Sequence, residues 1–594
     1  MIRRFFSIFP QRNIEERDAR PNRQPAGAKA GVPFPAFAAR LRPLQRRRPV
    51  AGGPGKLRPV PKQVAFGWVV WVMFSTAAAA GHDDMHGAAK VPEEVLTKPI
   101  AIHAGVGKAH QKVTTLSAEA QAFYDQGLAY LHSYVWVEAA RSFRQALRSD
   151  PRMGMAYVGL ADAYIGLQDV AGARAACERA RGLEAQMSGG ERAWLAIRDR
   201  EVAYLESGND GEKLSAYRQA VDEALKQNPH DSWLLVQRGL AAEASPFTHG
   251  QTSSEESLAY YRKALALEPG NLAAFHYAIH ANENLGNIKE ALEQSATYAR
   301  LAYAIPHAHH MHGHELMRMG RTEEAIQEFL KANALEENEY RAEGIPAQYD
   351  WHHAHNLQLM ALNYELLGQM KTAEKLLREA FALPAQTEFL AYNRRAWPEF
   401  LLDRGRYEEA LSAARELAKS DWAMARMAGH ALAGEAELGM GRADEARAEL
   451  ALAQKEAGGL PERVLAALPY PAALEAALKL REGRTQEGES LYVKVEESAM
   501  AMPGPDGWVA AVFVLDSIAR EARQAGDWQL AQYTAEKLIG HDPYFAGGHY
   551  ALGLVAEHAG ESDGAKEMFA AAAQYWSHAD QDLAELAAAR KKGR

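Results

Sequence analysis

Apolar residues recur at three- and four-residue intervals along most of the chain from about residue 115 onward. This period places them on one face of a helix, and the strict alternation typical of strands is missing. Gly and Asp-Pro pairs interrupt the pattern where helices are expected to end. The pattern therefore predicts an all-α protein.

The helical pattern also repeats at an interval of about 34 residues. A frame that starts at Ala120 places one set of apolar and small residues at fixed positions: Phe123, Gly127, Tyr130, Ala139, Phe143, Ala146 and Pro151. Frames from Gly154 and Ala546 place similar types at the same positions: Tyr157, Leu160, Ala161, Tyr164, Ala173 and Ala180, then Leu552, Gly553, Ala565, Phe569 and Ala572. Small residues allow two helices of a hairpin to approach closely, and large ones fill the space between hairpins.

These positions resemble the tetratricopeptide repeat, and the resemblance extends over residues 115–580. It implies a right-handed α-solenoid, a superhelix of stacked helix pairs in which no repeat buries its apolar face alone. It also implies that the first helix of each repeat faces a concave groove, with positions 2, 5, 9, 12 and 13 pointing into it. Such a groove typically binds a protein or peptide partner.

Histidines gather in the segment "AIPHAHHMHGHELMRMG", residues 304–320. His310 and His314 fall at groove positions 5 and 9 of their repeat, and each follows its counterpart in the preceding repeat, His276 or His280, by 34 residues. These repeats have frames that start at Leu272 and Pro306, and a third frame starts at Ala354. Further groove positions of the three frames hold Glu283, His307 and His355. In contrast, His309 and His312 fall at positions 4 and 7, where packing is expected. We expect Pro306 to start this helix and Gly320 to end it.

Two pairs of His at this spacing on neighbouring helices can direct four imidazoles at one small volume. The sequence therefore predicts a transition-metal site formed by four residues, with three more as supplementary ligands or outer support: His276, His280, His310 and His314, then His307, His355 and Glu283. Zinc or copper suits imidazole ligands, and the single cysteine, Cys177, rules out a thiolate cluster. The alternative is a polar groove without metal.

The His-rich segment also resembles a narrower group of exported bacterial tetratricopeptide-repeat proteins. The matching stretches are "FHYAIHANENLG", "AIPHAHHMHGHELMRMGRTEEA" and "YDWHHAHNLQLMA". Near the N-terminus the group usually has an "FNHxEA" motif, and this chain has Tyr134, Val135 and Trp136 in its place. The biochemical function of the group is not established, so the resemblance supports the site without assigning an activity.

An apolar run from Val64 to Phe74 follows Lys62 and precedes the small residues Ala77–Ala80. This order is typical of a secretory signal peptide and is short for a membrane span. Because signals stand near the start of a chain, we expect translation to begin near Val60 or Val64. The mature protein would then be periplasmic or secreted in a bacterium, without a transmembrane segment; a single N-terminal anchor is the alternative.

The chain thus divides into five expected parts. Residues 1–60 are basic, Pro-rich and predicted to be disordered, and residues 61–80 form the signal peptide. An extended linker is expected over 81–114, the repeats over 115–580, and a basic tail over 581–594.

Three functions are compatible with these features. The first is an exported scaffold that binds a protein, peptide or ligand in its groove and a metal at the His cluster. The others are a metal-dependent enzyme with Glu283 or Glu315 as base, and an interaction scaffold without metal. With a net charge of −9, the chain as a whole lacks the excess of basic residues that is typical of nucleic-acid-binding proteins. A zincin protease is excluded because Arg318 stands where its second His is needed after His314.

Overall fold

The structure is a computed structural model that describes residues 91–208, 210–243 and 250–594. The predictions for residues 1–60, for the signal peptide at 61–80 and for the first part of the linker therefore lie outside the described residues. Over the described ranges the regular elements are all helical. Within these ranges, no helix has the length and apolar character needed to cross a membrane.

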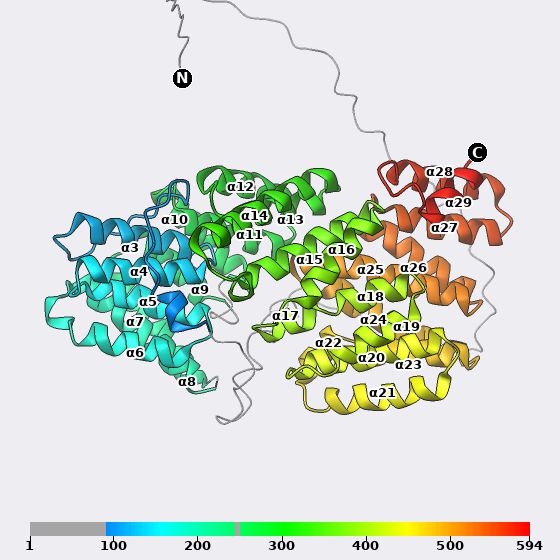
Figure 1. Cartoon of the computed structure of the whole chain (residues 1–594), viewed down its shortest axis with the longest axis horizontal. Coiled ribbons are helices and arrows are strands. Elements are labelled where there is room, and N and C mark those ends of the chain that lie inside the picture. The colour runs from blue at the N-terminus through cyan, green and yellow to red at the C-terminus, as the bar shows by residue number, and fades with distance from the viewer. Residues whose placement is uncertain (1–90, 209, 244–249) are drawn as a thin grey trace, which may run out of the picture. The chain divides into compact units, whose positions relative to one another are not determined.

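Figure 1 shows the helices in chain order. The N-terminal ones are α2 (Glu93–Leu96), α3 (Ala118–Leu131), α4 (Trp136–Ser149), α5 (Gly154–Gly166), α6 (Val170–Arg181), η2 (Glu184–Gln186), α7 (Gly189–Leu205), α8 (Gly211–Gln227), α9 (Ser232–Ala241) and α10 (Glu255–Leu267). The central ones are α11 (Leu272–Leu285), α12 (Ile288–Leu301), α13 (Pro306–Arg318), α14 (Thr322–Glu343), η4 (Ala347–Tyr349), α15 (Trp351–Leu366), α16 (Met370–Ala382), α17 (Glu388–Asn393), α18 (Ala396–Asp403) and α19 (Tyr407–Leu417). The C-terminal ones are α20 (Ala423–Gly439), α21 (Ala443–Ala457), α22 (Glu462–Ala467), α23 (Tyr470–Arg481), α24 (Thr485–Ala501), α25 (Gly504–Gln524), α26 (Trp528–His541), α27 (Ala546–His558), α28 (Ser562–Tyr575) and α29 (Ala584–Lys592).

Successive helices pair into hairpins that stack into an α-solenoid, as the sequence predicts. One contact recurs at the predicted close-approach position of these hairpins. A Cβ added to Gly127 would lie 2.6 Å from the Phe143 ring, and one added to Gly313 would lie 2.8 Å from the Phe329 ring. The pair Gly553 and Phe569 repeats the arrangement at 2.8 Å. Glycine is therefore required at this position, because any side chain would overlap the aromatic ring of the second helix.

The segments at the two ends of the repeats are packed against them. Between α2 and α3 the chain is largely without helix, yet it buries apolar side chains that include Ile100, Val106 and Val113. The region predicted as an extended linker thus covers the first repeats from residue 91 on. At the other end, α29 lies within the predicted basic tail and buries Leu586 and Ala589.

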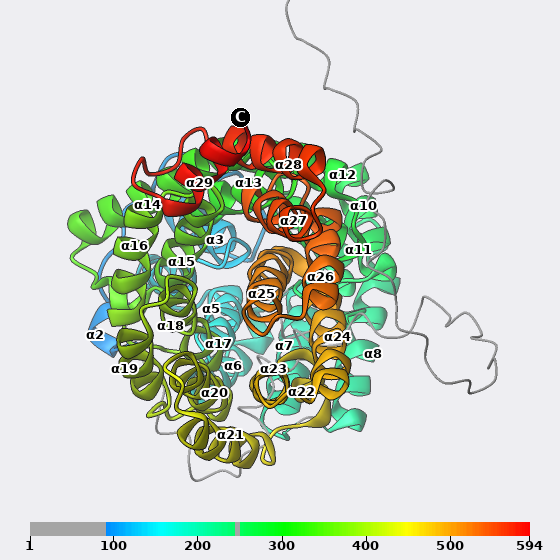
Figure 2. The same cartoon turned by 90° about the vertical axis from the view of Figure 1, so that its right-hand side faces the viewer.

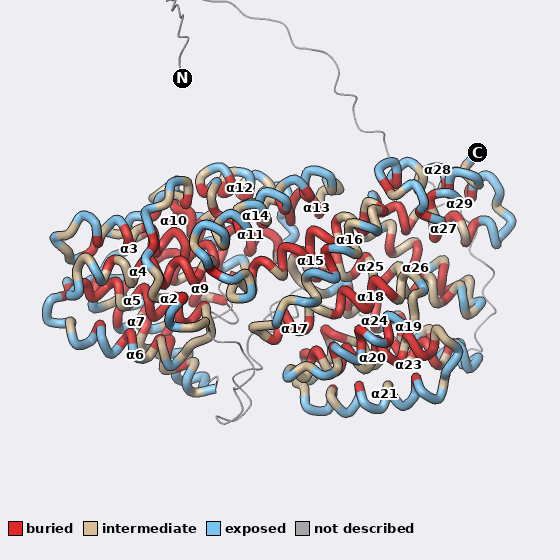
Figure 3. The backbone as a smooth tube through the Cα atoms, in the orientation of Figure 1, coloured by how far each residue is buried: buried red, intermediate tan, exposed pale blue. Residues whose placement is uncertain are grey.

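Three helices position the candidate site: α11, α13 and α15, each the first helix of a hairpin. Their first residues are Leu272, Pro306 and Trp351, and the first two agree with the predicted repeat frame. Gly320 follows α13 with a φ of +70° and ends it as predicted. Helix α25 contacts both α11 and α13, and Figure 2 shows it between α18 and α26. In Figure 3 the backbone of α15 is coloured largely as buried.

Candidate metal centre

Seven imidazoles form a continuous row along α11, α13 and α15, and none is more than 4% exposed: His276, His280, His307, His310, His314, His352 and His355. Adjacent rings in the row are close together. Ring centroids lie 4.8 Å apart for His276 and His307, 5.6 Å for His307 and His310, and 4.9 Å for His310 and His355. Burying so many polar rings is costly unless each finds a partner.

The row consists of three overlapping triads, in each of which one potential ligand atom per residue lies within 4.8 Å of the others. We call them the first triad (His276, His280 and His307), the middle triad (His307, His310 and His352) and the last triad (His310, His314 and His355). The first and last triads share no residue. The middle triad shares one residue with each of them.

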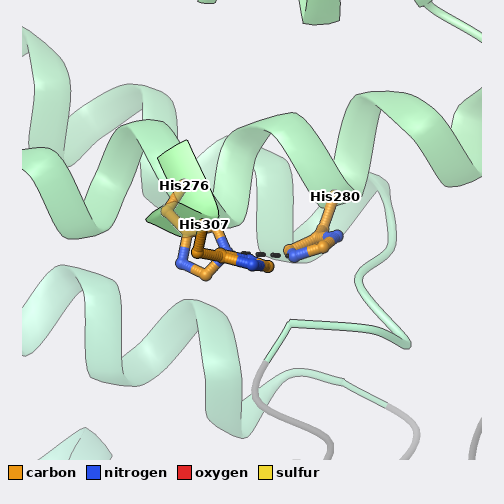
Figure 4. A group of neighbouring side chains, drawn as sticks. All are labelled: His276, His280 and His307. Carbon is orange, nitrogen blue, oxygen red and sulfur yellow. Dashed lines mark hydrogen bonds between the residues drawn. The ribbon is translucent and has the colours of Figure 1, made fainter. Parts of the chain in front are cut away.

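Figure 4 shows the first triad. Nε2 of His276 lies 3.0 Å from Nε2 of His307 and 3.1 Å from Nε2 of His280. The Nδ1–H of His276 donates to the carbonyl oxygen of His132 at 2.7 Å, and that of His280 donates to Oε2 of Glu283 at 3.0 Å. In their neutral forms both rings therefore direct an Nε2 lone pair at the same space. The side-chain amide of Gln251 donates to one of these lone pairs, with its Nε2 3.2 Å from Nε2 of His280. A cation between the imidazoles would replace this donor, and tetrahedral zinc with nitrogen ligands would set the imidazole nitrogens about 3.3 Å apart.

Three of the other five imidazoles are oriented in the same way, whereas Nδ1 of His307 and of His355 has no hydrogen-bond partner among the described residues. Nδ1–H of His314 donates to Oε1 of Glu283 at 3.3 Å, and that of His310 donates to Oδ1 of Asn356 at 2.9 Å. The amide of Asn356 is itself fixed, because its Nδ2 donates to the carbonyl oxygen of Phe329 at 3.1 Å. Nδ1–H of His352 donates to Glu336.

These contacts leave Nε2 of His310, His314 and His352 buried and without a hydrogen-bond partner among the described residues. At metal sites a ligating imidazole usually has one ring N–H donated to an oxygen acceptor, here Nδ1–H, and its other nitrogen, here Nε2, free to bind the metal.

Burial keeps part of the row neutral. It lowers the pKa of His276, His307 and His310 well below the usual value, assisted by the neighbouring imidazoles, and lowers that of His355 to about 4. Burial alone would raise the pKa of Glu283, but hydrogen bonds from His280 and His314 hold it well below the usual range. The site therefore combines neutral imidazoles with an ionised carboxylate, the protonation states that a transition metal requires.

Comparisons with known proteins agree with this architecture. A tetratricopeptide-repeat family model matches residues 124–188, and a second such model matches residues 306–339. The second segment includes the three residues that α13 contributes to the row, His307, His310 and His314. The chain therefore contains tetratricopeptide repeats in these two segments.

Among curated proteins none matches the chain. Similar solved structures include yeast Tom70 (14% identity, 73% of this chain and 92% of that one, TM-score 0.35). They also include a tetratricopeptide repeat protein from Parabacteroides merdae (14% identity, 47% and 99%, TM-score 0.33) and the human IFIT1 dimer with m7Gppp-AAAA (12% identity, 79% and 92%, TM-score 0.32).

All seven site residues predicted from the repeat frame lie at the row, but in a different arrangement from the one expected. No described group of ligand atoms unites His276 and His280 with His310 and His314, because His307 lies between the two pairs. The carboxylate of Glu283 accepts hydrogen bonds from Nδ1 of His280 and Nδ1 of His314. It therefore orients ligands of the first and last triads instead of facing a metal.

His309 and His312 point away from the row, as expected of packing positions. Nδ1 of His309 lies 2.7 Å from Glu328 on α14, and Nδ1 of His312 lies 3.1 Å from Oγ of Ser295 on α12.

The repeat frame did not identify His352, Tyr134 and Trp351. His352 lies in the first turn of α15, where Asp350 caps the helix by accepting a hydrogen bond from the His352 backbone N–H at 2.9 Å. Its spacing of three residues from His355 is the signal that could have found it. Tyr134 stands in the turn between α3 and α4 with a φ of +59°, and its ring lies 4.4 Å from His276. The ring of Trp351 lies 5.9 Å from His355.

The two carboxyl groups considered as catalytic bases do not fit that role. Both oxygens of Glu283 accept hydrogen bonds from imidazoles. Burial and the charge of Glu283 raise the pKa of Glu315 well above its usual range.

Proposed function

We propose that this tetratricopeptide-repeat protein is an exported scaffold that holds transition-metal ions in its buried His row and binds a protein or peptide along its inner helices. One observation carries the metal part of the proposal. Five imidazoles have their Nδ1–H groups fixed by oxygen acceptors, which directs their Nε2 lone pairs into the row: His276, His280, His310, His314 and His352. In three of them, His310, His314 and His352, Nε2 has no hydrogen-bond partner among the described residues.

The sharing of residues between triads sets the number of ions. The first and last triads can be filled together, whereas an ion in the middle triad competes with both. We therefore expect two ions per chain, each with three imidazole nitrogens and one further position for water or a partner group. Zinc and copper are the metals that suit this ligand set.

Variants of the row distinguish the triads. His280→Ala and His314→Ala should each reduce the metal content from two ions to one. Combining these two changes leaves the middle triad intact, so one ion remains. Replacing both His307 and His310 by Ala affects every triad and should abolish binding, while His309→Ala should leave two ions. Elemental analysis of protein purified without a polyhistidine tag or chelating resin measures each value. Unchanged metal content in the His307 and His310 double variant would refute the proposal.

The partner part of the proposal rests on the fold class, because tetratricopeptide repeats form scaffolds for protein interaction. Peptides selected from a random library on the metal-loaded chain should protect backbone amides of α11, α13 and α15 from hydrogen exchange. Protection confined to the second helices α12, α14 and α16 would contradict binding along the inner helices.

Export is supported by the apolar run from Val64 to Phe74 and the small residues that follow it. Intact mass of the protein from the periplasm or medium should correspond to a chain that starts near Gly81. Recovery of the full-length chain in the cytoplasm would contradict export.

A further inference from the structure

A second feature lies in the C-terminal half, and of the helices around it only α15 also carries residues of the His triads. It is a cavity of about 160 Å³ lined by side chains of α15, α18, α20, α23, α24 and α25. Helix α25 forms one wall, and an ion pair between Arg520 and Asp403 joins it to α18. A volume of this size accommodates a ligand about as large as one aromatic side chain.

Acidic groups outnumber basic ones around the cavity. Its lining includes six carboxyl groups and two guanidinium groups: Glu365, Glu399, Asp403, Glu435, Asp506 and Glu521, with Arg395 and Arg520. Both arginines already have partners within the protein. Arg520 pairs with Asp403, and Arg395 lies 3.6 Å from Glu399 with its guanidinium 4.3 Å from the Tyr392 ring centroid.

Most of the remaining carboxyl groups are also paired. Glu521 lies 3.1 Å from Arg481, Asp506 lies 3.8 Å from His355, and Glu399 accepts a hydrogen bond from Tyr470 at 2.5 Å.

Two of the lining carboxyl groups, Glu365 and Glu435, have no partner within the described part of the chain. Neither side chain makes a hydrogen bond or ion pair there; Glu365 is only 5% exposed, and Glu435 is half-buried. Burial raises the pKa of both to about 8, assisted by Asp403 and Glu399 for Glu365 and by Glu521 and Glu399 for Glu435. A buried carboxyl group without a partner is costly to the fold, and a bound cation would compensate it.

The rest of the wall selects the form of that cation. Aromatic and aliphatic side chains line the space between the carboxyl groups: Tyr392, Phe400, Leu432, Tyr470, Tyr492 and Val514. A hydrated metal ion would leave these surfaces facing water, whereas an apolar body would cover them. The aromatic faces also attract an organic cation.

We propose that this cavity binds a small organic cation, namely a primary ammonium or guanidinium group on an apolar body the size of one aromatic side chain. In the free cavity the raised pKa values favour the protonated forms of Glu365 and Glu435. The bound cation displaces these protons, the two carboxylates then supply the negative charge, and the Tyr and Phe rings enclose the body. The site is separate from the His triads and does not depend on their metal, although Asp506 contacts both the cavity and His355.

The test uses the full chain and 2-phenylethylamine as the probe, with binding measured by calorimetry at pH 7. We expect one site per chain and at least tenfold weaker binding of 2-phenylethanol, which has the same body without the charge. Glu365→Gln should weaken amine binding at least tenfold, and so should Glu435→Gln. The matched control Glu445→Gln removes an exposed carboxylate on α21 and should leave binding unchanged. Having two cavity variants keeps the test decisive if one of them fails to fold.

Several outcomes would overturn the proposal. These are equal binding of the alcohol and the amine, binding that survives both cavity substitutions, and displacement of the amine by equimolar calcium. Binding of a lysine-containing peptide without binding of the free amine would also overturn it, because the occupant would then be a protein segment.

Discussion

The carboxylate of Glu283 accepts hydrogen bonds from one imidazole of the first triad and one of the last. Its replacement by Gln tests whether these Nδ1–H hydrogen bonds orient the imidazoles for metal binding. Glu283 is 2% exposed, and each of its oxygens accepts one imidazole Nδ1–H, from His280 at 3.0 Å and from His314 at 3.3 Å. A Gln side chain offers one oxygen and one NH₂ group in the same volume. The NH₂ group would face one of the two Nδ1–H donors.

That imidazole can only restore a hydrogen bond by moving its proton to Nε2, and this removes the lone pair needed for the metal. Loss of such an outer partner usually costs 10- to 100-fold in metal affinity, or about 1.4–2.7 kcal/mol. We therefore expect one of the two sites to weaken by that factor, and the other to weaken less through loss of the negative charge.

Calorimetric zinc titration of the tag-free chain measures both dissociation constants. Glu328→Gln is the matched control, because Glu328 accepts a hydrogen bond from Nδ1 of His309 at 2.7 Å but His309 belongs to no triad. Dissociation constants for Glu283→Gln within threefold of wild type at both sites would refute the assigned role of the carboxylate.

Two further predictions concern stability. Gly313→Ala would place a Cβ 2.8 Å from Phe329, so chemical denaturation should show that the free energy of unfolding falls by about 1–3 kcal/mol. The control Gly540→Ala adds a Cβ in open space and should be neutral or slightly stabilising. Equal effects of the two substitutions would contradict the packing. Because the folded chain holds the Glu365 carboxyl protonated up to about pH 8, its contribution to stability is fully present below pH 4.5 and is lost as pH rises through 8. Glu365→Gln, which stays neutral, should therefore gain about 3.5 kcal/mol relative to wild type between pH 5 and pH 8, and a constant difference over that range would contradict the raised pKa.

The repeat frame predicted the fold and most of the His row because both depend on local periodicity. Positions 5 and 9 of the first helix share one face, so His276 and His310 could be aligned by counting residues. His352 was missed because the frame placed the start of that repeat at Ala354, whereas α15 begins at Trp351.

The remaining features depend on contacts that counting cannot supply. The repeat frame predicted that Glu283 lies near the histidines. Which nitrogen atoms its carboxylate contacts depends on the rotamers of two imidazoles from different helices. The cavity needs Glu365 on α15 and Glu435 on α20 to line the same space as α25, and no local pattern encodes that arrangement.

The metal content of tag-free protein after loading with zinc or copper and dialysis tests the central claim most directly. We expect two ions per chain at pH 7.5 and release of both only well below pH 6, because burial lowers the pKa values of the imidazoles of the row, that of His355 to about 4. A chain that retains no metal under any loading condition would contradict the account and leave the His row as a purely polar part of the repeat groove.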